Sequence, residues 1–186
     1  VVSDFVLENP PYGKKKRGTI YRLADEYSIF YHRFIKGQKR YTPGLWVQIA
    51  ASQTFKIWSG FAFESLCLKH VGAIKRALGI GAVYAEISSV RIPPTEANLG
   101  FQIDLLIDRK DDSINLCEIK FHAGPFTIDK TYYQQLLNKR QRFIDYSGTK
   151  KQVFLTFISN HGLIQNAYSR EIIDAEVLLD DILSNN

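Results

Sequence analysis

Residues 101–121 constrain the fold of this chain more than any other segment. Two runs in which apolar and polar residues alternate flank a polar turn, Arg-Lys-Asp-Asp-Ser, and this is the pattern of a β-hairpin. Because strand side chains alternate between faces, one face of the first strand is predicted to carry Phe101, Ile103, Leu105 and Ile107. The opposite face is predicted to carry Gln102, Asp104, Leu106 and Asp108. In the second strand, Cys117, Ile119 and Phe121 are predicted to face away from Leu116, Glu118 and Lys120.

The register of this hairpin is predicted to bring two acidic residues together. A turn centred on Asp111 places Asp104 directly across from Glu118, with their Cβ atoms about 4.5–5.5 Å apart. Two carboxylates at that distance repel each other, and a divalent cation converts the repulsion into ligation because hard cations bind carboxylate oxygens. Lys120 follows Glu118 by two residues and reaches the same face. A slip of one residue would place Ile119 opposite Asp104 and remove the site.

A further carboxylate lies in the longest predicted helix, residues 54–78. Its apolar stripe at helical spacing consists of Ile57, Phe61, Leu68 and Val71. Glu64 lies within that stripe, where a carboxylate is costly unless it is paired. It is either a core residue bonded to a backbone group or a base, or a third carboxylate that faces Asp104 and Glu118. The apolar residues on both sides favour the second interpretation.

These acidic residues and their spacing resemble the core of the PD-(D/E)XK nuclease superfamily. The superfamily pattern is an Asp on one strand, a Glu-x-Lys on the next and often a Glu on the preceding helix. Here the pattern corresponds to Asp104, to Glu118-Ile119-Lys120 and to Glu64, and Ile103 stands where Pro is usual. The resemblance implies an α/β fold with a restriction-endonuclease-like αβββαβ core, in which helices flank a mixed sheet.

The resemblance also implies Mg²⁺-dependent hydrolysis of DNA. Asp104, Glu118 and the carbonyl of Ile119 would hold one or two Mg²⁺, and Glu64 would be an outer ligand or a ligand of the second metal. Lys120 would orient the attacking water and stabilise the phosphate. Three alternatives stay open: a plain cross-strand ion network, a catalytically silent module that binds nucleic acid or regulates an ATPase, and a protein-interaction domain.

The positive charge of the chain is concentrated near its N-terminus. Residues 1–44 contain nine Lys and Arg against four acids, whereas residues 45–186 are balanced, within a net charge of +5. This contrast predicts a boundary near residues 41–44, which separates a basic segment, 1–44, from a domain, 45–186. The basic run at 14–17 is either a solvated loop or a phosphate contact. A strand at 19–23 and a helix at 25–35, with Asp25 as its N-cap or in its first turn, are predicted to follow.

The basic segment resembles the end of the winged-helix domain in a bacterial and archaeal ATPase family of unassigned role. In that family a nuclease-like domain follows, so the resemblance implies the ATPase portion of a longer chain as a partner. The chain contains no G-x-x-x-x-G-K-[ST] motif and is not expected to bind ATP through a P-loop. It also contains no Met, which is expected of a piece of a longer protein or of a sequence recorded without its methionines.

The two cysteines and the hydropathy of the chain indicate a cytoplasmic protein. Cys67 and Cys117 lie in apolar segments at no metal-ligand spacing, so they are predicted to be buried free thiols, with a disulfide as the lesser alternative. No apolar run approaches the roughly 20 residues that span a bilayer.

A second amphipathic helix is predicted at 129–146, after the hairpin. Its apolar side consists of Tyr132, Leu136, Leu137 and Phe143. Its basic side, either solvated or in contact with a DNA backbone, consists of Lys130, Lys139, Arg140 and Arg142. A buried strand at 153–158 and a further strand at 169–179, with a frayed end at 180–183, complete the predicted elements.

Overall fold

The computed structural model describes residues 2–4, 21–23, 25–38, 43–94 and 99–184. The basic run at 14–17 and part of the predicted boundary at 41–44 lie outside these residues. In chain order the elements are β1 (Val2–Asp4), β2 (Tyr21–Leu23), α1 (Glu26–Phe30), η1 (Tyr31–Ile35), α2 (Leu45–Ala51), α3 (Gln53–Lys69), α4 (Val71–Ala77), β3 (Ala85–Ile92), β4 (Phe101–Arg109), β5 (Ser113–Lys120), α5 (Lys130–Ser147), β6 (Gln152–Ser159), α6 (Ala167–Ile172), β7 (Ala175–Leu178) and α7 (Leu179–Ser184). Within the described ranges, none of the helices combines the length and the apolar character needed to cross a membrane.

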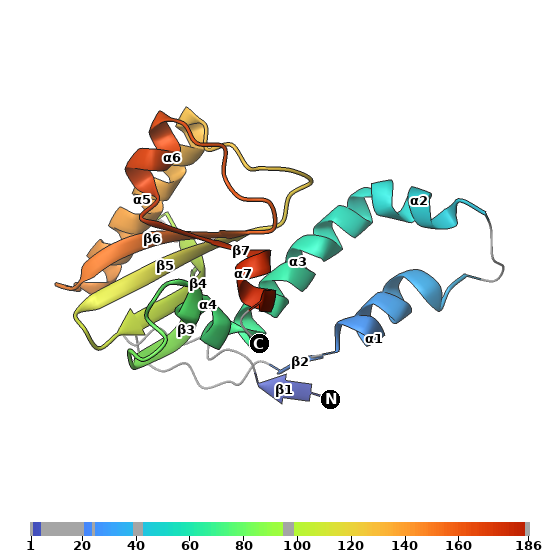
Figure 1. Cartoon of the computed structure of the whole chain (residues 1–186), viewed down its shortest axis with the longest axis horizontal. Helices are drawn as coiled ribbons and strands as arrows, with labels where there is room; N and C mark the ends of the chain where they lie inside the picture. The colour runs from blue at the N-terminus through green and yellow to red at the C-terminus, as the bar shows by residue number, and fades with distance from the viewer. Residues whose placement is uncertain (1, 5–20, 24, 39–42, 95–98, 185–186) are drawn as a thin grey trace.

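The centre of the fold is a mixed five-stranded sheet in the order β3-β4-β5-β6-β7, with helices on both of its faces (Figure 1). β3, β4 and β5 form an antiparallel meander, whereas β6 runs parallel to β5 and β7 parallel to β6. β1 and β2 form a separate two-stranded sheet. The predicted α/β class is therefore confirmed, and β5 is the central strand of the five.

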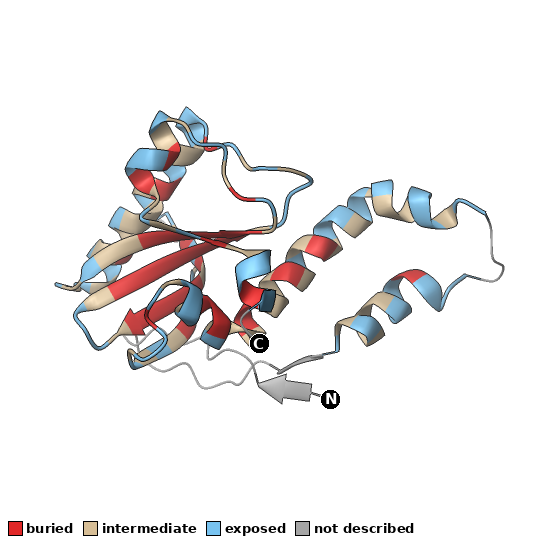
Figure 2. Ribbon diagram, in the orientation of Figure 1, coloured by how far each residue is buried: buried red, intermediate tan, exposed pale blue. Residues whose placement is uncertain are grey.

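Each face of the sheet packs against its own set of helices, and the buried residues follow this division (Figure 2). The core cluster under α3, α4 and α7 includes Phe63, Cys67, Ile74, Leu105, Ile107, Cys117, Ile119 and Ile182. The core cluster under α5 and α6 includes Val90, Phe101, Ile103, Leu106, Leu116, Leu136, Phe143 and Ile172. Because both faces are covered, the interior strands carry buried apolar residues on both sides.

The β4–β5 hairpin has the predicted register. Leu105 lies opposite Cys117 and Asp108 lies opposite Ile114, which centres the turn on Asp111. Asp112 adopts a left-handed conformation with φ of 58°, which Asp tolerates better than most residues. The alternation of apolar and polar residues, together with the polar turn, therefore predicted the strand pairing correctly.

A register irregularity interrupts the first half of β4. On its two sides, the paired residues of β3 and β4 are Ser88 with Leu106 and Val90 with Ile103. One residue of β3, Ser89, therefore lies opposite two residues of β4, Asp104 and Leu105. This two-against-one arrangement is a β-bulge, which locally bends a strand and redirects its side chains.

The bulge makes the predicted faces of β4 wrong. Phe101 and Ile103 pack in the cluster under α5, whereas Leu105 and Ile107 pack in the cluster under α3 and α4. A single regular alternation would have placed all four on one face. The extra residue reverses which face the side chains point to at Asp104, which is the first residue of the predicted metal site.

The predicted helix at 54–78 is two helices, α3 and α4, which meet at His70. His70 has φ of −108° and ψ of 31°, outside the helical range, and the change of direction brings Ala73 and Ile74 into the core. The predicted apolar stripe is also wrong in its first half. Ile57 and Phe61 are 53% and 63% exposed, because only the C-terminal part of α3 packs on the sheet (Figure 2).

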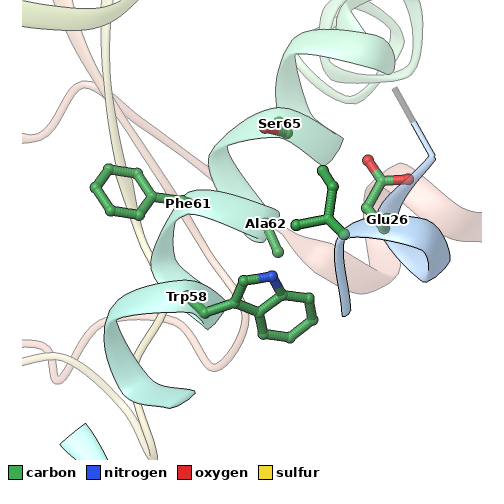
Figure 3. Close-up of a pocket in the computed structure, with 6 residues that line it drawn as sticks. Glu26, Trp58, Phe61, Ala62 and Ser65 are labelled. Atoms are coloured by element: carbon green, nitrogen blue, oxygen red, sulfur yellow. The ribbon is translucent and has the colours of Figure 1, made fainter. Parts of the chain in front are cut away.

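The rest of α3 belongs to an arm with α1, η1 and α2 that extends away from the sheet (Figure 1). Of the two positions predicted for Asp25, the structure shows the N-cap of α1, and the helix continues as the π-helical η1. The arm is held by aromatic packing among Phe30, Phe34, Trp46, Phe55 and Trp58. A pocket of about 70 Å³ between α1 and α3 is lined by Glu26, Ile29, Trp58, Phe61, Ala62 and Ser65 (Figure 3), none of which is a candidate site residue.

The C-terminal elements differ in part from those predicted. α5 begins after its N-cap Asp129 and β6 is buried as predicted, but the segment predicted as a strand at 169–179 contains the end of α6 before the short β7. Asn166 and Ser169 form a reciprocal capping box, which starts the helix there. The predicted frayed end is helix α7.

Candidate functional site

Asp104 and Glu118 lie just past the end of the β4–β5 ladder, within electrostatic reach of each other. The paired positions of the two strands end at Leu105 and Cys117, next to the bulge. Beyond them, the backbone N–H of Ile119, two residues after Cys117, donates to Asp104 Oδ2 at 3.0 Å. This contact ties the carboxylate of β4 to the backbone of β5. Ile119 meets the site through this N–H, and its carbonyl as a metal ligand stays a prediction.

Glu118 is the most fully enclosed group of the site. Its residue is 5% exposed, and each of its two carboxylate oxygens accepts from a cation. Lys120 Nζ lies 2.8 Å from Oε1, and the hydroxyl of Tyr132 donates to the same oxygen at 2.6 Å. Lys139 Nζ pairs with Oε2. A buried carboxylate is tolerated when it is paired and hydrogen-bonded in this way.

Two of these partners, Tyr132 and Lys139, come from α5, and the sequence reasoning missed both as site residues. The predicted basic side of this helix includes Lys139, and this prediction is wrong, since the Lys139 side chain is only 23% exposed and binds Glu118. It lies seven residues after Tyr132 and four before Phe143, so helical spacing places it on the apolar stripe. A charged residue within an apolar stripe, the feature that marks Glu64, therefore marks Lys139 as well.

The surroundings of the two acids push their pKa values in opposite directions. Burial, together with the charge of Glu118, raises the pKa of Asp104, against the Ile119 N–H and the two lysines, which lower it. Burial alone would raise the pKa of Glu118 as well, but the charges and hydrogen bonds of Lys139 and Lys120 outweigh it and lower the pKa. Glu118 is therefore held ionised, and Asp104 is the carboxylate that takes up a proton first.

The surroundings of Lys120 favour its protonated form, and those of Tyr132 favour its neutral form. Burial opposes the charge of Lys120, but Glu118, Asp104 and Glu64 outweigh it and raise the pKa of this ammonium. Burial and the neighbouring Glu118 raise the pKa of Tyr132, so its phenol stays a neutral donor.

Glu64 lies on α3, on the other side of the sheet from α5, and is half-buried. Its charge contributes to raising the pKa of Lys120, and burial followed by its charge raises the pKa of Cys67 to about 12. It is thus within electrostatic reach of the site. Cys67 and Cys117 are buried free thiols, as predicted.

The donor set can be compared with the needs of a divalent cation. Two carboxylates and a backbone carbonyl are oxygen donors of the kind that Mg²⁺ uses while it keeps most of its waters. Across the described part of the chain, however, no three His, Cys, Asp or Glu residues form a group that could hold a metal. The two carboxylates are already balanced by two ammonium groups. The donors fit a cation if Lys139 withdraws from Glu118.

Comparison with known proteins adds no family. No family model and no curated protein matches the chain. The chain is similar to a solved structure, the crystal structure of a protein of unknown function, AF1548, with 15% sequence identity and a TM-score of 0.39. The similarity covers 57% of this chain and 55% of that one, so it spans about half the length of either protein.

Proposed function

We propose that this domain is a Mg²⁺-dependent hydrolase of DNA phosphodiester bonds, built on a restriction-endonuclease-like core. The observation that carries the proposal is the electrostatic cluster of Asp104, Glu118 and Lys120 at the end of the β4–β5 ladder. The order of one helical segment, three strands, a helix and a strand supports it. In a longer parent chain the domain would serve the ATPase portion that the sequence resemblance implies.

Each residue has a distinct role in this proposal. Asp104, Glu118 and the Ile119 carbonyl would hold Mg²⁺, which would supply charge neutralisation at the phosphate and a more reactive water. Lys120 is 36% exposed at its side chain, and its ammonium binds a phosphate oxygen and orients the water. Glu64 acts through its charge, which favours the protonated form of Lys120.

Plasmid nicking in Mg²⁺ tests this function. Asp104→Ala and Lys120→Ala are each expected to abolish cleavage, because one removes a ligand and the other the ammonium. Asp111→Ala and Lys110→Ala are matched controls in the exposed turn of the same hairpin and are expected to cleave like the wild type. Cleavage that survives both site substitutions contradicts the proposal.

The second candidate is a catalytically silent module that binds nucleic acid or regulates the ATPase. The pairing of both Glu118 oxygens with lysines favours it, because such a network is stable without a metal. It predicts that DNA is retained in an electrophoretic shift assay without cleavage, and that added salt weakens the retention. No retention at low salt would instead favour a protein-interaction domain.

A further inference from the structure

Lys139 occupies a position that no part of the predicted motif explains. Its ammonium reaches the strand residue Glu118 from a separate element, α5, and pairs with Oε2. The other oxygen, Oε1, is bound by Lys120 and by the Tyr132 hydroxyl. Lys120 thus pairs with one oxygen of the carboxylate, and Lys139 pairs with the other.

The charges of the two acids on the hairpin and of the two lysines cancel, and Glu64 on α3 adds one negative charge within electrostatic reach of Lys120. Asp104 and Glu118 supply two negative charges, and Lys120 and Lys139 supply two positive ones. A divalent cation added to this set would leave an excess of positive charge in a buried place, which is unfavourable unless an ammonium leaves. The ammonium on the long, partly exposed side chain of Lys139 can move to solvent, because 23% of that side chain is already accessible.

We infer that Lys139 is a tethered counter-cation, which holds Glu118 in the metal-free protein and competes with a divalent cation for its Oε2. This inference rests on the cation site of the proposed function but not on cleavage. Lys139 is accordingly a positioning residue: it fixes Glu118 while the site is closed and sets the concentration of divalent cation at which the site opens. Lys120 stays beside Oε1 in both states.

The test compares the affinity of Mn²⁺ alone for the wild-type chain and for Lys139→Gln, by isothermal titration calorimetry. The variant is expected to bind Mn²⁺ about tenfold more tightly, within the usual range of coupling between two sites. The metal-free variant is expected to melt a few degrees lower than the metal-free wild type. Mn²⁺ is expected to raise the Tm of the variant by more than it raises the Tm of the wild type. Lys130→Gln is the matched control, since it removes the same charge from an exposed position of the same helix.

A purely structural Lys139 would lower the Tm without changing the affinity for Mn²⁺, and equal or weaker binding by Lys139→Gln overturns the inference. If neither chain binds Mn²⁺, the inference and the proposed cation site both fail. If Mn²⁺ binds more tightly to the variant but no DNA is cut, the inference holds and only the proposed activity fails.

A measurement on the wild-type chain covers the case in which Lys139→Gln does not fold. Acetylation of lysines by acetic anhydride, followed by mass spectrometry, reports how accessible each ammonium is. Saturating Mn²⁺ is expected to increase the acetylation rate of Lys139 several-fold and to leave that of Lys130 unchanged. An unchanged or lower rate at Lys139 in the presence of Mn²⁺ overturns the inference.

Discussion

The two ends of the β4–β5 hairpin each bury a carboxylate, but they do so in different ways. Near the turn, Asp108 is 4% exposed, and Lys151 Nζ lies 2.7 Å from its Oδ1. Lys151 also donates to the carbonyl of Arg109 at 2.7 Å, so this ammonium joins a side chain to the backbone. At the opposite end, Glu118 shares its two oxygens among Lys120, Lys139 and Tyr132.

This contrast separates a structural ion pair from a candidate site. The pair at the turn places one ammonium against one carboxylate, and the backbone contact of Lys151 ties it to β4. The ladder end places two carboxylates beside two ammonium groups, and its members have opposed pKa shifts. Two neighbouring carboxyl groups whose pKa values are pushed apart are typical of functional sites, whereas one ion pair with a backbone contact is sufficient for stability.

The largest effect on stability is expected at the turn. Lys151→Met removes the ammonium beside the buried Asp108, and breaking such a pair is expected to lower the free energy of unfolding by about 3 kcal/mol. Urea denaturation measures this loss. Lys150→Met, at the exposed neighbouring position, is the matched control and should change little. The affinity for Mn²⁺ is expected to stay the same in both variants, and a changed affinity in Lys151→Met would show that the two ends are coupled.

A smaller effect is expected at the ladder end when one donor is removed. Tyr132→Phe deletes the hydrogen bond to Glu118 Oε1 but leaves both lysines, so the expected loss is about 1 kcal/mol by urea denaturation. Tyr133→Phe, next to it on α5, removes the exposed hydrogen bond to Glu171 and should cost less. A loss at Tyr132 as large as that at Lys151 would mean that the three donors act as one unit.

The register of the hairpin could be predicted from the sequence. Apolar and polar residues alternate along both strands, and with the polar turn between them only one pairing buries the apolar residues. The bulge at Asp104 could not be predicted, since it adds one residue to a strand in which apolar and polar residues alternate regularly in the sequence. Its effect is confined to the ladder end, where Phe101 and Ile103 change faces.

The residues predicted for the candidate site lie on the hairpin, with Glu64 on α3 in addition, and none was predicted on α5. Lys139 and Tyr132 approach Glu118 through packing of α5 on the sheet, which no local spacing encodes. Both residues nevertheless lie on one stripe of that helix in the sequence, because Lys139 follows Tyr132 by seven residues and precedes Phe143 by four. The split of α3 from α4 at His70 is marked only by Val71 and Gly72 directly after it, two residues of low helix propensity within a pattern that otherwise favours one continuous helix.

The smallest expected effect has the opposite sign and concerns Asp104. Asp104→Asn removes a charge that burial and Glu118 disfavour, while its amide oxygen can still accept from the Ile119 N–H. Relief of one like-charge contact across a strand pair is expected to raise the free energy of unfolding by about 0.5 kcal/mol at neutral pH. The same variant is expected to lose affinity for Mn²⁺, so a gain in stability would accompany a loss of binding.

The pH dependence of this gain identifies its origin. The pKa of Asp104 in the folded chain lies above its ordinary value of 3.8, so the folded protein takes up this proton before the unfolded chain does. The penalty in the wild type is therefore full at neutral pH and disappears as the pH falls through the folded pKa and below 3.8. Denaturation of both chains across this range should show curves that are separated near pH 7 and converge in acid. A separation that is constant with pH would mean that the shape of the Asn side chain, and not the charge of Asp104, accounts for the difference.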